Sequence, residues 1–134
     1  ARGLEWVIGY LGAAAVLALT ERGGAVASGA IVLSDRLLVG PKAVRHDLAG
    51  NALSAAEWKQ VPRLLAEPEA VLYDKVNGTL LYVLPSQDGR KTKVVIEGAR
   101  VEKKRAPYES VRTAFKIEAS SLRLTQFELI YGRL

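Results

Sequence analysis

The chain of 134 residues has no cysteine, no methionine and a single histidine. Without cysteine it can form neither a disulfide framework nor a finger-type zinc site, and thiol catalysis is excluded. One histidine argues against a transition-metal site, and we predict no cofactor. The absence of methionine leads us to expect a single domain, residues 1–134, that belongs to a longer protein.

The chain also lacks a long apolar run. Residues 6–19 carry no charge, but a helix that crosses a membrane needs roughly 20 apolar residues. The few residues before this run are a poor match to the basic start of a signal peptide. We therefore expect a soluble domain with no membrane segment. The run itself predicts a packed helix from Leu4 to Leu19, ended by Gly23 and Gly24.

Charge is unevenly distributed along the chain. Residues 90–116 contain nine basic and three acidic residues, a net charge of +6, whereas the whole chain has a net charge of +5. Such a concentration attracts polyanions. A solvated loop is an equally good interpretation of the segment Arg100–Arg105 taken alone.

The first half of the chain is predicted to be mainly helical. A short strand at Ala30–Leu33 precedes a helix that Gly40-Pro41 interrupts. Ser54 and Glu57 have the spacing of a capping box, which begins a helix that ends before Pro68. Pro62 inside that helix predicts a kink or a split.

The second half is predicted to be mainly strands. Asn77-Gly78 predicts a hairpin between Ala70–Tyr73 and Leu80–Leu84. Strands at Thr92–Glu97 and Ser110–Ile117 follow, and the end of the chain is either a further strand at Phe127–Tyr131 or a docked tail. We therefore expect an α+β fold, with a helical half over about residues 1–67 and a roughly four-stranded antiparallel sheet over about residues 68–134.

Motifs distributed over most of the chain resemble those of a known family. They are Ile31–Leu38, Ser54–Leu65, Glu67–Asp74, Leu80–Val83, Lys93–Val95 and Val111–Ala114. The pattern resembles the phage-encoded ribonuclease-like domain that is grouped with barnase, EndoU, colicin nucleases and RelE, and that is found fused to phage head-morphogenesis proteins. The resemblance implies a helical half followed by an antiparallel sheet, and metal-independent cleavage of RNA.

The chain departs from the pattern of that family at one position. Where the family has a histidine, this chain has Val39, whereas Lys42 and Arg45 match two basic positions of the family. The histidine of this chain is His46, one residue beyond Arg45. Either His46 substitutes for the missing residue, or the chain has lost its acid–base group and is a binding or structural module.

Cleavage of RNA by 2′-hydroxyl attack needs a base, a proton donor and cations near the phosphate. On a regular strand Arg112 would face away from Thr113, a conflict that a bulge near Thr113 would remove. Our candidates are catalytic His46, Thr113 and Arg112, and phosphate-binding Lys42, Arg45, Lys91 and Lys93.

These observations predict an endoribonuclease of the phage toxin or effector type that cleaves RNA, with tRNA among the candidate substrates. The alternative is a catalytically inactive phage structural or nucleic-acid-binding domain. The expected partners are RNA and either an acidic immunity protein or phage head proteins. The expected location is the phage virion or, after delivery, the bacterial cytoplasm.

Overall fold

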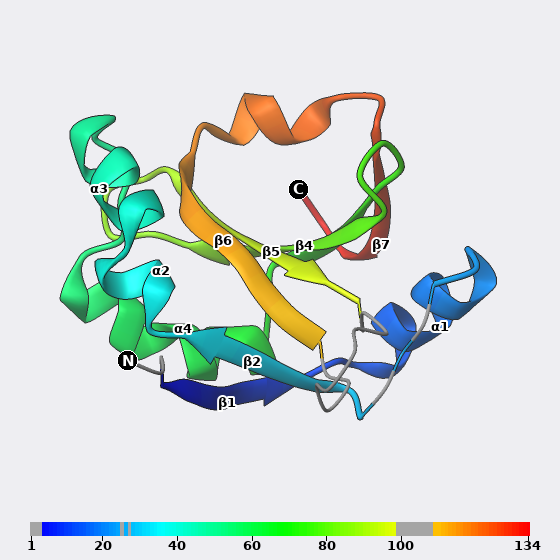
Figure 1. Cartoon of the computed structure of the whole chain (residues 1–134). Helices are drawn as coiled ribbons and strands as arrows, with labels where there is room; N and C mark the ends of the chain where they lie inside the picture. The colour runs from blue at the N-terminus through cyan, green and yellow to red at the C-terminus, as the bar shows by residue number, and fades with distance from the viewer. Residues whose placement is uncertain (1–3, 25, 27, 99–108) are drawn as a thin grey trace.

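The computed structural model describes residues 4–24, 26, 28–98 and 109–134. Within these residues the chain forms one seven-stranded sheet in the order β1-β2-β6-β5-β4-β3-β7, with helices around it (Figure 1). The strands are β1 (Glu5–Tyr10), β2 (Ala30–Ser34), β3 (Ala70–Asp74), β4 (Thr79–Pro85), β5 (Lys91–Glu97), β6 (Glu109–Ile117) and β7 (Phe127–Gly132). The helices are α1 (Ala13–Glu21), α2 (Arg36–Val39), α3 (Pro41–Leu48), α4 (Ala55–Ala66) and the 3-10 helix η1 (Ala119–Arg123).

The predicted helix from Leu4 to Leu19 is wrong. Residues 5–10 form strand β1, which pairs antiparallel with β2, and only the later part of the run forms helix α1. Two glycines, Gly9 and Gly12, weaken a helix across this run by about 1 kcal/mol each, whereas Trp6, Val7 and Ile8 are residue types that favour strands. In the described part of the chain, no helix combines the length and apolar character that crossing a membrane requires.

The expected division into a helical half and a four-stranded antiparallel sheet is also wrong. Strands β1 and β2, from the first half of the chain, belong to the same sheet as the later strands. Strand β2 runs parallel to β6 through the pairs Ile31–Glu109 and Val32–Ser110, so the sheet is mixed. The remaining neighbours pair antiparallel, and β7 adds a further strand beside β3.

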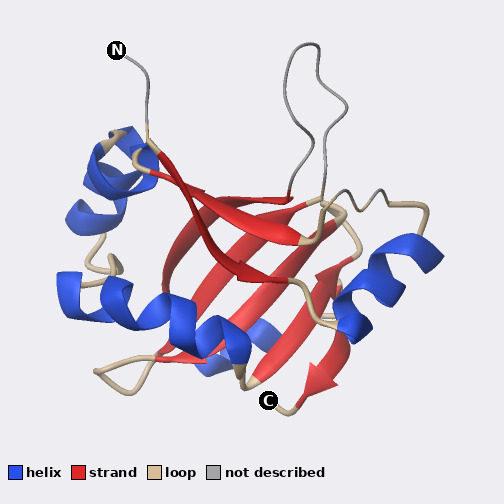
Figure 2. Ribbon diagram, turned by 90° about the horizontal axis from the view of Figure 1, so that it is seen from below, coloured by secondary structure: helices blue, strands red, loops and turns tan. Residues whose placement is uncertain are grey.

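The two faces of the sheet are covered differently. Figure 2 shows a long helix, α4, crossing in front of the strands, and the short helix η1 behind them. Under α4 lies the larger hydrophobic cluster, which includes Val61, Leu65, Leu80 and Val94. On the other face, called the η1 face from here on, a smaller cluster surrounds Leu122 of η1. The central strand β4 is buried from Thr79 to Leu84 because both faces are covered there.

Several local predictions are confirmed. Helix α4 begins with the capping box of Ser54 and Glu57, although it continues through Pro62 without a split. The break between α2 and α3 falls at Gly40-Pro41. Strands β3 and β4 form a hairpin around Asn77-Gly78, and the end of the chain contributes strand β7.

Candidate functional site

A bulge in β6 brings Thr113 and Phe115 to the η1 face. Val95 of β5 pairs with Thr113 and the next residue, Ile96, pairs with Val111, so Arg112 is an extra residue in β6. As a result Val111 and Ala114, three positions apart, both join the cluster under α4. Thr113 and Phe115 therefore share the opposite face with their partners Val95 and Lys93.

Helix α3 presents two of the predicted residues to this part of β6. Lys42 and His46 lie four positions apart and so project from one side of the helix. Lys42 Nζ donates a hydrogen bond to the backbone oxygen of Arg112 at 2.8 Å. His46 Nε2 lies 3.0 Å from Thr113 Oγ1. The structure therefore brings the predicted residues His46 and Thr113 into direct contact.

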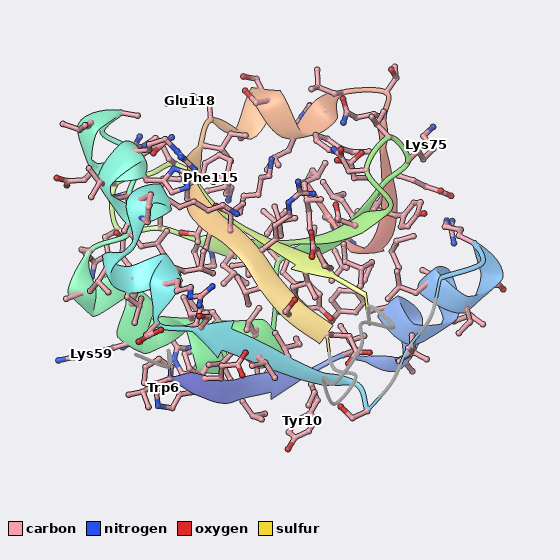
Figure 3. All side chains as sticks on the ribbon, viewed as in Figure 1. Trp6, Tyr10, Lys59, Lys75, Phe115 and Glu118 are labelled. Atoms are coloured by element: carbon pink, nitrogen blue, oxygen red, sulfur yellow. The ribbon has the colours of Figure 1, made fainter. Side chains whose placement is uncertain are left out.

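The ring of His46 is fixed by two further residues. It stacks on Phe115, with 4.8 Å between the ring centroids and 21° between the planes. Figure 3 labels Phe115 on β6, beside α2 and α3. His46 Nδ1 lies 3.2 Å from Asn51 Oδ1. The loop that carries Asn51 is itself anchored, because the backbone N–H of Lys116 donates to the Asn51 carbonyl oxygen at 2.7 Å.

These contacts define a hydrogen-bonded chain from amide to imidazole to hydroxyl. A carbonyl oxygen can only accept, so the Asn51 oxygen places the proton of a neutral His46 ring on Nδ1. Nε2 is then free to accept from the hydroxyl group of Thr113. An imidazole held in this tautomer can remove a proton from a hydroxyl group that comes near Nε2. Neither Asn51 nor Phe115 was among the predicted site residues.

Lys93 lies on the η1 face, next to the hydrogen-bonded side chains of Asn51, His46 and Thr113. Its Nζ is 4.9 Å from the ring centroid of Phe115 and 5.8 Å from that of Phe127. The side chain is half-buried, and this burial lowers the pKa of Lys93, whereas the nearby Asp74 carboxylate acts in the opposite direction. A phosphate bound beside Lys93 would favour its charged form. Lys93 and His46 thus both contact the ring of Phe115.

Most of the other predicted cations form ion pairs with carboxylates and do not belong to this cluster. Lys91 Nζ is 2.8 Å from Glu69, and Arg112 Nε is 3.3 Å from Glu97. Lys116 lies within 3.1 Å of Glu57 and 2.9 Å of Asp88, and both carboxylates raise its pKa. Arg112 occupies the bulge with its side chain half exposed. Among the described cations of residues 90–116, Lys93 alone has no carboxylate within 4.0 Å.

The remaining predictions fall outside the cluster. Arg45 is exposed on α3. Val39, at the position of the family histidine, ends α2 and is 79% exposed. The basic segment Arg100–Arg105 lies outside the described residues. The described part of the chain contains no group of three or more histidine, aspartate or glutamate side chains placed to hold a metal ion.

Comparisons with known proteins show a similarity to a phage protein. No family model and no solved structure matches the chain. The chain is similar to the "Putative capsid assembly protein F" of Escherichia phage Mu, with 26% identity over 115 residues, which cover 86% of this chain and 25% of the Mu protein. The chain thus spans about a quarter of the length of that relative. The comparisons connect the chain to a phage capsid assembly protein and do not support the ribonuclease domain that its motifs resemble.

Proposed function

We propose that this chain is a nucleic-acid-binding module of a phage head-assembly protein. The similarity to the phage Mu protein over most of the chain supports the phage context. The cluster of His46, Thr113, Lys93 and Lys42 on the η1 face supports contact with phosphates. Phe115 stacks on His46 and so holds its imidazole ring in place beside Thr113.

The phage role is tested by a chimera. The segment of the phage Mu protein that matches this chain is replaced by the chain, and capsids are counted by electron microscopy in cells infected with Mu that lacks its own copy. The matched control carries an unrelated domain of the same length. We expect more capsids with this chain than with the control, and equal counts would contradict a role in assembly.

Nucleic-acid binding is tested by fluorescence anisotropy with short single-stranded RNA and DNA over a series of salt concentrations. Removing one phosphate contact lowers the slope of log affinity against log salt by about 0.7 to 0.9. We expect this change for Lys93→Ala but not for Lys59→Ala, which removes an exposed lysine of α4. An unchanged slope for Lys93→Ala would show that the cluster does not bind nucleic acid.

The contact between His46 and Thr113 supports a second candidate, metal-independent cleavage of RNA. His46 would remove the 2′-hydroxyl proton, and Thr113 and Lys93 would contact the phosphate. Total RNA and tRNA are incubated with the protein in excess chelator, and new ends are mapped. Cleavage that leaves 2′,3′-cyclic phosphate and falls by about 10²-fold or more in His46→Ala would support this activity. Intact RNA would leave binding as the function.

A further inference from the structure

A cavity lies on the η1 face, away from His46. This cavity of about 410 Å³ is formed where η1 and the end of β7 meet β3 and β4. Pro68 and Leu134 supply apolar walls above the buried Val83 and Leu122, and Tyr131, Arg123 and Arg133 supply polar ones. This volume is within the usual range for small-molecule sites, roughly 300 to 1,000 Å³.

The backbone at Gly132 fixes one wall of the cavity. Gly132 has φ of 77°, and a Cβ atom there would lie 2.0 Å from the backbone oxygen of Glu69. This close approach lets the backbone N–H of Arg133 donate to the same oxygen at 3.1 Å. Tyr131 and Arg133, the residues on either side of Gly132, therefore line the cavity from a backbone that is held firmly against β3.

The charges around the cavity are not balanced. Lys91 and Glu69, which also line it, neutralise each other at 2.8 Å. Arg123 and Arg133 have no carboxylate within 4.0 Å in the described part of the chain, unlike Arg22, Arg90 and Arg112. Two arginines that have no carboxylate partner among the described residues thus line a cavity that has apolar walls.

We propose that this cavity binds a nucleotide, with its phosphate between Arg123 and Arg133 and its base against Pro68 and Tyr131. Guanidinium groups bind phosphate oxygens through paired hydrogen bonds, and a tyrosine ring stacks on a base. The apolar walls explain why the ligand is a nucleotide and not inorganic phosphate alone. This site goes beyond the proposed function, because a nucleotide can occupy it whether or not the His46 cluster binds nucleic acid.

The cavity and the His46 cluster lie on one strip of the sheet. Val83 in the cavity wall pairs with Lys93, and Lys93 pairs with Phe115 under His46. Strand spacing puts Val83 about 10 Å from Phe115 across β5. The nucleotide is therefore either free or the 5′-phosphorylated end of an oligonucleotide that continues toward Lys93.

The test is a calorimetric titration of the protein with adenosine 5′-monophosphate, adenosine and inorganic phosphate. We expect the monophosphate to bind most tightly, and the double variant Arg123→Ala, Arg133→Ala to weaken its binding at least tenfold. Both arginines are exposed, so we expect the variant to keep the melting temperature of the wild type. Lys59→Ala, on the other face, serves as the charge control.

The outcomes separate this site from the proposed function. The site is overturned if the monophosphate does not bind, if adenosine binds equally well, or if the double variant binds like the wild type. It is also overturned if His46→Ala abolishes binding of the monophosphate while the double variant retains it. Binding of a short 5′-phosphorylated oligonucleotide more tightly than its 5′-hydroxyl form identifies the ligand as a nucleic-acid end. Equal binding of the two oligonucleotides identifies it as a free nucleotide.

Discussion

Gly132 combines a backbone conformation that disfavours a side chain with a lack of space for one. A left-handed conformation costs other residues about 1–2 kcal/mol, and a Cβ at Gly132 would also collide with the backbone oxygen of Glu69. We expect Gly132→Ala to lower the free energy of unfolding by clearly more than Gly23→Ala. Gly23 has a similar φ of 79° with no atom within 4 Å of a Cβ, so it isolates the conformational cost. If urea denaturation gives the same loss of unfolding free energy for Gly132→Ala and Gly23→Ala, the collision at Gly132 is contradicted.

The buried carboxylate of Glu57 makes stability depend on pH. Burial alone would raise its pKa, but hydrogen bonds from the backbone of Gln87 and Ser54, together with Lys116, outweigh burial and hold the pKa below its ordinary value of 4.5. The stabilisation by Glu57 is therefore complete above about pH 4.5 and is lost as the pH falls through the lowered pKa.

We expect Glu57→Gln to be less stable than the wild type at pH 7, with the difference narrowing as the pH is lowered below 4.5. Urea denaturation over this pH range measures the effect, and the exposed Glu67→Gln is the matched control. A difference that stays constant with pH would show that Glu57 acts by packing and not by charge.

Some of the candidate site could be predicted residue by residue, and some could not. The alternation over Ser110–Ile117 predicts a strand, but the bulge at Arg112 places Val111 on the face opposite Thr113 and Phe115. The motif directed attention to Thr113, whereas His46 was a candidate as the single histidine of the chain. The role of Asn51 depends on a loop that folds back onto β6, where its oxygen accepts from His46. A loop residue has no periodicity, so no local pattern identifies this contact.

At the scale of single elements, helix α4 was predicted well because its signals are local. The Ser54 hydroxyl accepts from the backbone N–H of Glu57 at 3.1 Å. We expect Ser54→Ala to cost about 1 kcal/mol of stability, measured by thermal unfolding. Ser120→Ala in η1, whose side chain is exposed, should have a much smaller effect. If Ser54→Ala leaves the stability unchanged, the hydrogen bond from the Ser54 backbone N–H to the Glu57 carboxylate is sufficient to cap the helix.

Strand β1 shows why a local pattern can fail. Its residues are half or fully exposed, so the strand carries no clear alternation of apolar and polar positions. What selects the strand is pairing with β2, more than twenty residues later in the sequence. The parallel pairing of β2 with β6, which joins residues 31 and 109, was not predicted for the same reason. Tertiary pairing of this kind has no signature within either segment.

For the whole molecule, the net charge of a sequence segment does not give the charge of a surface, because many cations are paired with carboxylates from other segments. The net charge of +6 over residues 90–116 suggested a continuous basic surface. In the structure, four of the described cations in that segment contact carboxylates, and three of these carboxylates lie outside the segment, Glu57, Glu69 and Asp88. Lys93, Arg123 and Arg133 are among the described cations without a carboxylate within 4.0 Å, and they lie on the η1 face, where we expect anions to bind.

The arrangement of the sheet predicts uneven protection against hydrogen exchange. Strands β3 to β6 pair along most of their length, and β4 is buried on both faces. Strand β1 is an exposed edge, and among the described residues two pairs join β2 to β6. We expect the amides of β4 and β5 to exchange slowest and those of β1 much faster. Equal protection in β1 and β4 would show that the sheet opens as one unit.

The parallel pairing of β2 with β6 also has a consequence for synthesis on the ribosome. Strands β1 and β2 are made before β6, and this partner of β2 follows only after residues 35–108 have been translated. Until then the residues Ile31 to Leu33 of β2 lack one of the two strands beside which they lie in the finished sheet. The antiparallel pair of β1 and β2 therefore keeps one unpaired edge during synthesis until β6 has been made.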